Sequence, residues 1–400
     1  MCVIRFERAI PGVLIFMVIL CRSVQSLGAD FALQALAHTN DGGYASACVL
    51  SGNYLFLANG DDGLRVYDIS NPANPVGAGH VNNGGSAVGL AISGQYVYLA
   101  NSQDGVRIYD ISSPSIPNNI GHITNSVQAL CVAVSGHFLY LGQDRGQLRV
   151  YDVSTPSNPV NVGSTNIGLW PILGIAVTPN FAYLANFDFG LVVVDISNPT
   201  NPRFVTNWGD AILSGVAANV VVAGNYAYAA WAYGNDAYGG GVRIFDISNA
   251  TNITNVGYTN TGGGLSVAVS GQYVAGATPS GFCIEDASNP AAPFVVTGTT
   301  NLAPALGIVV SGNYVYASHR SDGLRTYLLV PSLKISPSAS AGVTLAWPAS
   351  LTPRFVLQKN SDVASTNWLT ATNTAAVISN GNQITIAPNT NKTFFRLKFQ

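Results

Sequence analysis

A unit of about forty residues recurs along the chain, and this repeat restricts the possible fold more than any other feature of the sequence. In its first copy, Tyr54-Leu-Phe-Leu-Ala58 is followed by Gly63-Leu-Arg-Val-Tyr-Asp68. The aspartates that end the second segment are Asp68, Asp110, Asp152, Asp195, Asp246 and Asp286, at spacings of 42, 42, 43, 51 and 40 residues. This spacing is typical of the four-stranded blades of a β-propeller.

Each unit divides into four expected strands, here called a to d in chain order. Strand a is a run of small apolar residues such as Ser86–Ile92, strand b begins at the repeated tyrosine, and strand c ends at the repeated aspartate. Strand d follows an Asn-Pro-x-x-Pro turn or a shorter variant. Aromatic and β-branched residues between turn residues favour strands, and helical periodicity is absent. Strand a occurs seven times, beginning near Tyr44, Ser86, Val127, Ile172, Val216, Leu265 and Ala305. We therefore predict an all-β protein built around a seven-bladed β-propeller.

The last unit is one strand short. It ends with strand c at Gly323–Leu329 and then runs into Pro331. At the other end of the chain, Phe31–His38 resembles a strand d without a unit of its own. Pairing these two segments would complete blade seven and remove the exposed edges that promote aggregation. We expect this N-terminal strand to close the last blade.

Segments such as Leu191-Val-Val-Val-Asp195, together with their counterparts in the other units, resemble the LVIVD-repeat family of exported bacterial and archaeal surface proteins. The resemblance covers residues 31–330. It implies a β-propeller and brings no general catalytic activity with it. Unit six departs from the pattern at Gly281–Asp286, and unit seven has Leu328 where the aspartate is expected.

The N-terminus has the features of an export signal. Arg5 and Arg8 precede an apolar run, Ile10–Cys21, of about a dozen residues. A signal peptide has this length, whereas a membrane-spanning helix needs ~20 residues. We expect residues 1–29 to be a signal peptide and residues 30–330 to be the propeller. The mature protein would then be secreted or located at the cell surface, without a membrane span.

Residues 331–400 differ from the preceding chain in charge and pattern. Alternating segments such as Val343–Trp347 and Gln383–Ile386 predict a small C-terminal β-sandwich. This segment has a net charge of +5, whereas residues 30–330 have a net charge of −9. The positive module is a candidate for attraction to anionic envelope polymers. The acidic propeller argues against nucleic acid as a partner, because nucleic-acid binding requires a basic surface.

Recognisable catalytic and cofactor motifs are absent from the sequence. It contains no nucleophile elbow, HExxH segment or phosphate-binding loop, so we predict no catalytic residue and no cofactor. His38, His80 and His122 recur 42 residues apart. Equivalent positions on the outer strands of successive blades lie too far apart to share one ion, so we predict no metal site.

In an antiparallel four-stranded blade, the b–c and d–a loops emerge on the same face, called here the b–c face. Acidic residues collect there: Asp61, Asp62, Asp104, Asp144, Asp188, Asp236 and Asp322. Asp-Gly pairs favour tight hairpin turns, so a structural role in the turns is an alternative to chemistry. The six aspartates that end strand c are expected to accept local backbone N–H groups.

Unit five carries an insertion at 231–241, and two more tryptophans precede strand a of units four and five. Aromatic rings with polar neighbours suit sugars or extended peptides. The predicted ligand-binding residues are Trp170, Trp208, Trp231, Tyr233, Asp236 and Tyr238. The alternative is that the tryptophans pack the layer of loops.

These observations favour a non-enzymatic extracellular or cell-surface protein that binds or scaffolds, with one propeller face engaging a glycan or a protein. Two alternatives stay open. The protein could be a polysaccharide-active hydrolase or lyase that uses the acidic residues of the same face. It could also be a purely structural surface protein.

Overall fold

In a computed structural model of the protein, the described residues of the propeller region are 31–331 without 41, 83, 125–126, 188, 210–215 and 233–239. At the N-terminus, residues 2–5 and 18–21 are described. Toward the C-terminus, the described residues are 334–337, 343–348, 355–360, 367, 369–370, 376–378, 381–386 and 394–399. The chain divides into two compact units, one formed by Ala35–Leu328 and the other by Met1–Gln34 together with Leu329–Gln400.

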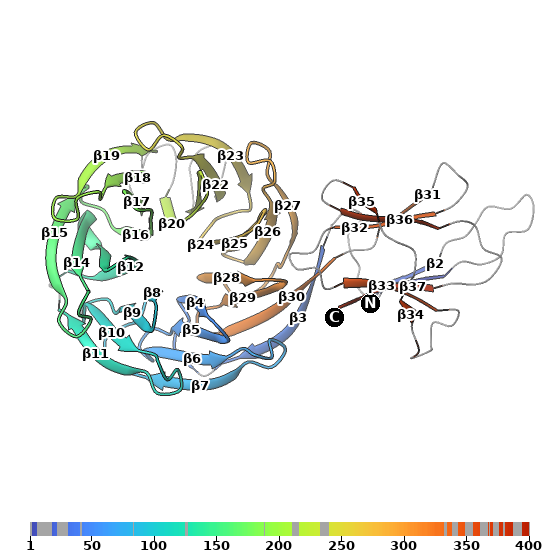
Figure 1. Cartoon of the computed structure of the whole chain (residues 1–400), viewed down its shortest axis with the longest axis horizontal. Helices are drawn as coiled ribbons and strands as arrows, with labels where there is room; N and C mark the ends of the chain where they lie inside the picture. The colour runs from blue at the N-terminus through green and yellow to red at the C-terminus, as the bar shows by residue number, and fades with distance from the viewer. Residues whose placement is uncertain are drawn as a thin grey trace, which may run out of the picture. The chain divides into compact units, whose positions relative to one another are not determined.

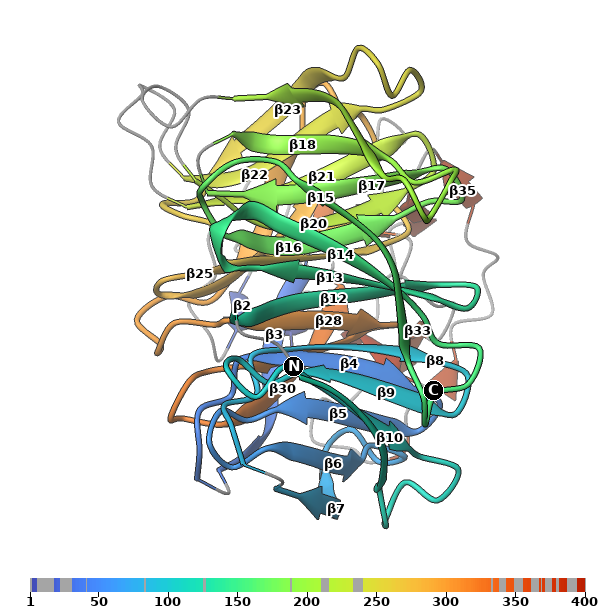
Figure 2. The same cartoon turned by 90° about the vertical axis from the view of Figure 1, so that its left-hand side faces the viewer.

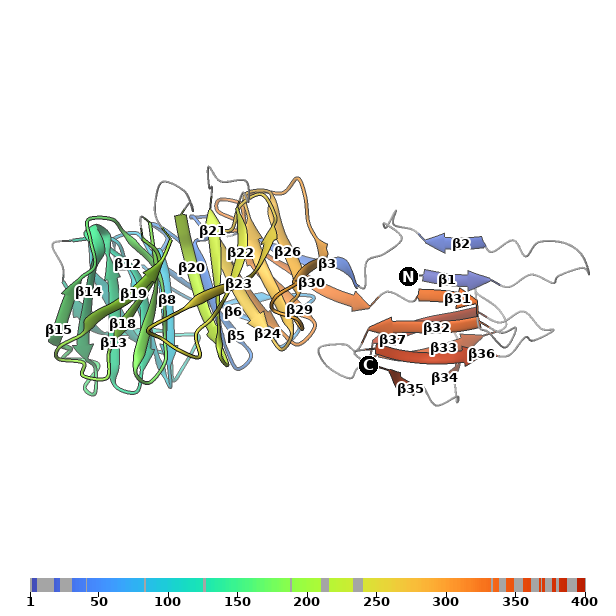
Figure 3. The same cartoon turned by 90° about the horizontal axis from the view of Figure 1, so that it is seen from above.

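The repeats form seven antiparallel four-stranded sheets around a common axis (Figure 1), so the predicted all-β, seven-bladed propeller is confirmed. The strands of each blade run between the two faces of the ring (Figures 2 and 3). Blade one consists of β4 (Ala47–Ser51), β5 (Tyr54–Ala58), β6 (Leu64–Asp68) and β7 (Val76–Val81). Blade two consists of β8 (Gly89–Ser93), β9 (Tyr96–Ala100), β10 (Val106–Asp110) and β11 (Asn118–Ile123). Blade three consists of β12 (Ala129–Ser135), β13 (Phe138–Gln143), the 3-10 turn η1 (Asp144–Gly146), β14 (Gln147–Asp152) and β15 (Val160–Asn166).

The remaining blades follow the same order, from the innermost strand to the outermost. Blade four consists of β16 (Ile172–Val177), β17 (Phe181–Asn186), β18 (Gly190–Asp195) and β19 (Arg203–Trp208). Blade five consists of β20 (Val216–Ala223), β21 (Tyr226–Ala232), β22 (Gly241–Asp246) and β23 (Thr254–Asn260). Blade six consists of β24 (Ser266–Ser270), β25 (Tyr273–Thr278), β26 (Gly281–Asp286) and β27 (Phe294–Gly298). The sheet of blade seven has the order β28 (Gly307–Ser311), β29 (Tyr314–Ser318), β30 (Leu324–Pro331) and β3 (Phe31–Thr39).

Successive blades interlock at their outer strands. In strand d of blade one, Gly79 lies so close to the next c–d turn that a Cβ atom would sit 2.6 Å from the carbonyl oxygen of Pro114. Glycines at the same place in blades two, three and five lie even closer to the proline carbonyl of the following turn, in the pairs Gly121–Pro156, Gly163–Pro199 and Gly257–Pro290. The absence of a side chain therefore allows each of these turns to rest on the preceding outer strand.

The repeated aspartates at the ends of strands c stabilise the turns that follow them. Oδ1 of Asp68 accepts a hydrogen bond of 2.8 Å from the backbone N–H of Ser70. The equivalent bond occurs in blades two to six, between Asp110 and Ser112, Asp152 and Ser154, Asp195 and Ser197, Asp246 and Ser248, and Asp286 and Ser288. The expected local turn role of these six carboxylates is confirmed.

The described C-terminal residues form two antiparallel sheets. One sheet contains β31 (Lys334–Pro337), β32 (Val343–Pro348), β36 (Gly381–Ile386) and β35 (Ala376–Ile378); the other contains β34 (Leu369–Thr370), β33 (Phe355–Asn360) and β37 (Phe394–Phe399). Leu345 and Trp347 are buried in the first sheet, and Leu357 and Phe395 in the second. The packing of the two sheets as a sandwich stays a prediction. At the N-terminus, β1 (Cys2–Arg5) pairs with β2 (Val18–Cys21).

Candidate functional site

The b–c face carries a repeated polar network in blades one, two and seven. In blade one, the carboxylate of Asp62 lies in the b–c loop, where it accepts a hydrogen bond of 2.8 Å from Asn59 Nδ2 and pairs with Arg65 Nε at 2.5 Å. The ring nitrogen Nε2 of His80, on strand d, lies 3.2 Å from the same carboxylate. One aspartate thus connects strands b, c and d at the b–c face.

Blades two and seven repeat this network. Asp104 pairs with Arg107 at 2.7 Å and lies 3.4 Å from His122 Nε2. Asp322 pairs with Arg325 at 2.7 Å, and His38 Nε2 on β3 lies 3.3 Å from it.

Partial burial by itself would raise the pKa of Asp62, but hydrogen bonds from Arg65 and Asn59 outweigh burial and hold the pKa below its usual value. The pKa values of Asp104 and Asp322 are lowered in the same way by Arg107 and Arg325. These three carboxylates therefore stay ionised and engaged in structural pairs. They lack the raised pKa that general-acid catalysis near neutral pH requires.

Blade four departs from this network, and its departures create an exposed aromatic patch on the b–c face. The patch consists of Leu169 and Trp170 in the d–a loop, and of Phe187 and Phe189 in the b–c loop. The rings of Trp170 and Phe187 stack, with centroids 5.4 Å apart and an interplanar angle of 17°. Trp170 is 47% exposed and Leu169 is 82% exposed. Exposed apolar residues that gather in this way mark interaction sites.

A buried amide holds the aromatic patch in place. Asn186, at the end of β17, donates from Nδ2 to the carbonyl oxygens of Trp170 and Pro171 at 2.9 and 3.1 Å. Its Oδ1 accepts the backbone N–H of Phe189 at 2.9 Å. On strand d, Asn207 Nδ2 donates to the carbonyl oxygen of Phe189 at 3.2 Å. The patch therefore rests on the rigid ends of two strands, and its loops are tied to each other.

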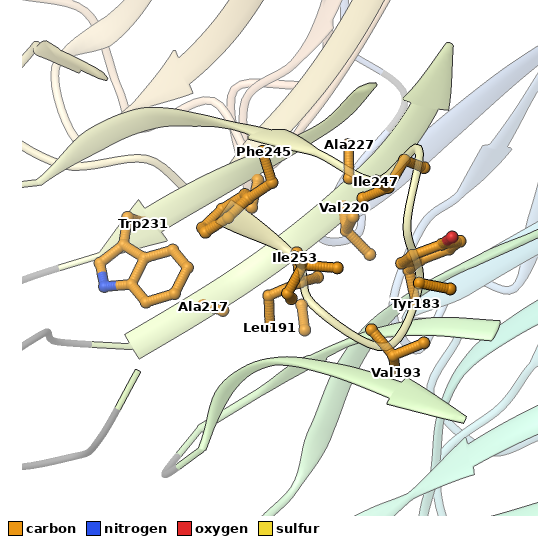
Figure 4. Packing of buried hydrophobic residues seen from close by; sticks show 13 residues of the cluster. Tyr183, Leu191, Val193, Ala217, Val220, Ala227, Trp231, Phe245, Ile247 and Ile253 are labelled. Carbon is orange, nitrogen blue, oxygen red and sulfur yellow. The ribbon is translucent and has the colours of Figure 1, made fainter. Parts of the chain in front are cut away.

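The interpretation of Trp231 as an exposed ligand-binding residue is wrong. Its side chain has no exposed surface and lies in the core between blades four and five, beside Phe245 (Figure 4). Trp208 is half-buried and contacts Trp231 edge-on at 5.8 Å. The guanidinium of Arg243 lies over both rings, 5.2 Å from Trp208 and 5.1 Å from Trp231.

The reason for this placement is the register of blade five. Trp231 pairs with Gly241 inside the sheet and so belongs to strand b, not to the insertion. A Cβ atom on Gly190 would lie 2.9 Å from the Trp231 ring, so this glycine in blade four provides the space that the indole fills. For Trp208 and Trp231, this placement agrees with the alternative prediction, in which the tryptophans have a packing role and do not bind a ligand.

The six predicted site residues therefore have different outcomes. Tyr233, Asp236 and Tyr238 lie outside the described residues. Trp170 lies on the exposed surface and contacts Phe187, while Trp208 and Trp231 contact each other. The sequence interpretation missed Phe187 and Phe189. The sequence does contain a signal for these two residues. The b–c turn of blade one reads Asn-Gly-Asp-Asp-Gly at 59–63, whereas that of blade four reads Asn-Phe-Asp-Phe-Gly at 186–190, with two aromatic residues in an otherwise polar turn.

Among the residues that the structure describes, no three His, Cys, Asp or Glu side chains are grouped so that they could hold a metal ion. Within the same residues, none of the helical segments has the length and hydropathy needed to cross a bilayer.

Comparison with known proteins identifies the repeat. The LVIVD repeat family matches residues 42–83, 84–125, 128–167, 173–210, 214–261, 262–299 and 304–325. No curated protein matches the sequence.

Solved structures with the same fold are distant in sequence. The crystal structure of the computationally designed Ika8 protein has a TM-score of 0.55 and 10% identity, and the match covers 74% of this chain and 99% of that chain. A chain in the crystal structure of the mitotic checkpoint complex has a TM-score of 0.59 and 12% identity, covering 80% and 99%. The β-propeller domain of Cps50 (Swd1) from Myceliophteria thermophila has a TM-score of 0.58 and 13% identity, covering 74% and 99%. At these identities the likeness establishes the fold alone.

One buried carboxyl group belongs to neither the networks nor the patch. Glu285 on β26 occupies the place that Tyr67 and Tyr109 hold in blades one and two, and its side chain is fully buried. The thiol of Cys283 donates to Glu285 Oε1 at 3.3 Å. Burial raises the pKa of Glu285 to about 7.

Replacing Glu285 by glutamine tests this environment through the pH dependence of stability. Folding raises the pKa of Glu285 from its ordinary value of 4.5 to about 7, so its contribution to stability is complete below pH 4.5 and is lost as the pH rises to about 7. The midpoint of thermal unfolding, measured by circular dichroism, should fall for the wild type between about pH 5 and pH 8. Glu285→Gln should reduce this fall and should unfold at a higher temperature than the wild type at about pH 8.

The matched control is Asp68→Asn. Hydrogen bonds from Ser70 lower the pKa of Asp68, so the stability that its carboxylate contributes is lost only as the pH falls through the acidic range. Asp68→Asn should therefore show the same fall of the unfolding midpoint between about pH 5 and pH 8 as the wild type. A Glu285→Gln variant that is less stable than the wild type at about pH 8 would contradict the assignment.

Proposed function

We propose, since the chain belongs to the LVIVD repeat family, that it is a non-enzymatic binding protein whose b–c face holds its ligand at the aromatic patch of blade four. The observation that carries this proposal is the exposed, stacked pair of Trp170 and Phe187. Their rings lie on loops held by hydrogen bonds to the buried Asn186, so the surface is ordered before a ligand arrives. Ordering in advance lowers the entropic cost of binding.

The ligand class that suits this surface best is a glycan. The exposed rings of Trp170 and Phe187 offer an apolar surface, and a sugar ring has an apolar face that can stack on an aromatic ring. A polar side chain lies beside the turn, since Asn207 on the neighbouring strand d is partly exposed and bonds to the carbonyl oxygen of Phe189. An extended peptide is the competing ligand.

A hydrolase that uses the acidic residues of the b–c face is the weaker alternative. Asp62, Asp104 and Asp322 are each paired with an arginine in the same blade. A carboxylate in such a pair has a lowered pKa and cannot readily supply a proton to a leaving group.

We also propose that β3 closes the ring from the N-terminal end of the chain. The sheet order of blade seven, with β3 next to β30, supports this proposal. His38 on β3 meets Asp322 as His80 meets Asp62 and as His122 meets Asp104. The N-terminal strand thus carries the side chain that blades one and two place on strand d.

The location outside the cell is a proposal that rests on residues 1–29. N-terminal sequencing of protein recovered from the culture medium would test it, because an intact Met1 would contradict cleavage. Retention by anionic envelope polymers through the positive C-terminal segment is part of the same proposal.

Closure is tested by deleting residues 30–40 and by the single substitution His38→Ala. Without β3 the ring has an open blade, so the deletion should lower the unfolding midpoint of the propeller strongly. His38→Ala should lower it slightly, and by about as much as His80→Ala, because both histidines occupy the same place in the network. If the deletion and His38→Ala both leave the midpoint unchanged while His80→Ala lowers it, β3 does not close the ring.

The binding site is tested with the variant pair Trp170→Ala and Trp231→Ala. Screening on a glycan array gives the tightest-binding oligosaccharide, which is then titrated by calorimetry. A stacked ring contributes on the order of 1 kcal/mol, so Trp170→Ala should weaken binding about fivefold at an unchanged unfolding midpoint. Trp231→Ala removes a fully buried indole and should cost about 3–5 kcal/mol of unfolding free energy.

The control for loss of an exposed ring is Phe204→Ala, since Phe204 is exposed on the outer strand of blade four and not in the aromatic patch. It should bind as the wild type does. Equal affinities of the wild type and Trp170→Ala for the oligosaccharide would contradict the proposed site.

A further inference from the structure

A histidine takes the place of an amide at the b–c end of blade seven. Where strand b ends, blades one, two and four have Asn59, Asn101 and Asn186, and blade seven has His319. All four side chains are buried. They share one position in the repeat, so the asparagines show what a side chain at this position normally does.

The asparagine connects the two loops of its blade. Asn101 Nδ2 donates to the carbonyl oxygen of Gly84 in the d–a loop at 2.5 Å and to Asp104 Oδ2 in the b–c loop at 2.9 Å. Asn59 makes both equivalent bonds at 2.8 Å. An amide side chain does not titrate, so these two connections do not depend on pH.

The imidazole of His319 makes only the first of these two bonds. Its Nδ1 lies 2.8 Å from the carbonyl oxygen of Ala303, in the d–a loop that enters blade seven, so Nδ1 carries the hydrogen. Nε2 is buried and has no hydrogen-bond partner in the described part of the chain. The carboxylate of Asp322 is instead paired with Arg325 and lies 3.3 Å from His38.

The surroundings do not compensate a positive charge on this imidazole. The side chains that act on it electrostatically are Arg325 on β30, Asp322 in the b–c loop and His38 on β3. The d–a loop, residues 299–306, contains no titratable side chain, and neither do residues 278–282 of blade six, to which that loop bonds. Of the three side chains, Asp322 alone favours the charge, and it already faces Arg325 and His38.

Burial has the largest effect on the imidazole, and it lowers the pKa of His319 below its ordinary value of 6.5. The unfolded chain therefore takes up this proton more readily than the folded chain does. The stability that neutral His319 contributes is complete above about pH 6.5 and is lost as the pH falls below that value. A charge in a buried site without a partner is costly, and opening of the site to water relieves this cost.

We propose that His319 is a proton-sensitive latch for blade seven. Neutral His319 holds the d–a loop to the end of β29, and its protonation in mild acid releases this loop and opens the blade locally to water. The blade concerned is the one in which β3 and β30, from opposite ends of the propeller region, are neighbours. The latch is independent of the aromatic patch and of any ligand bound there.

The experiment is amide hydrogen exchange of the full chain at about pH 7 and about pH 5.5, with each rate divided by the intrinsic rate at that pH. The reporter is the amide of Ala305, which donates to the carbonyl oxygen of Thr278 in blade six. Its protection should fall by up to about tenfold at the lower pH, because the open form takes up a proton with the ordinary pKa of 6.5. The matched amide of blade two, Ala87, should keep its protection, because Asn101 cannot be protonated. Constant or increased protection of Ala305 would overturn the proposal.

The chain itself suggests the variant that removes the latch. His319→Asn introduces the side chain of blades one and two, which can donate to both Ala303 and Asp322. Its Ala305 amide should have the same protection at both pH values, and its unfolding midpoint should rise relative to that of the wild type as the pH falls from about 7 to about 5.5. His137→Asn, at an exposed position in the a–b turn of blade three, should change neither quantity.

An equal loss of protection in His319→Asn and in the wild type would assign the pH dependence to another group and overturn the proposal. If His319→Asn does not fold, the comparison of the two matched amides in the wild type still decides.

Discussion

The contact between an outer strand and the next turn governs how the units of this propeller assemble. A glycine such as Gly79 leaves its backbone bare, and the carbonyl oxygen of Pro114 in the following blade rests against it. A Cβ atom on Gly79 would lie 2.6 Å from this oxygen, so the turn of the following blade would have to shift to make room for it. The close stacking that buries Tyr67, Tyr109 and the apolar strands of each blade depends on this approach.

The polar network of the b–c face is kept in three blades, and blades four and five depart from it. Blades seven, one and two keep the aspartate, arginine and histidine of the network. Blade four replaces that network with aromatic rings, and Asn186 becomes the support of an exposed surface. In blade five, Arg243 lies instead over the buried ring of Trp231 and over the half-buried ring of Trp208 from blade four. Blades seven, one and two thus share one polar network, and blade four carries the candidate site.

The number of blades could be predicted because the period and the turn aspartates are properties of the chain itself. The role of Asp68 and its counterparts was also predictable, since the acceptor and the donor are two residues apart. The position of Trp231 was not, because it depends on the register between β21 and β22 and on the space beside Gly190 in another blade. The aromatic patch was half predicted: Trp170 was identified, but its partner Phe187 follows from contacts between two loops.

The outer-strand glycine has a consequence for the sequence of the following unit. Blade four has Thr206 at this place, and the turn of blade five has Ala250 instead of proline. Blade six has Thr297 there, and blade seven lacks the Asn-Pro turn altogether. In both cases the change in one unit is matched by a change in its neighbour. Each of these threonines is therefore compatible with the altered turn that follows it, whereas the same threonine placed before an Asn-Pro turn such as that of blade four would bring its side chain against the proline carbonyl oxygen.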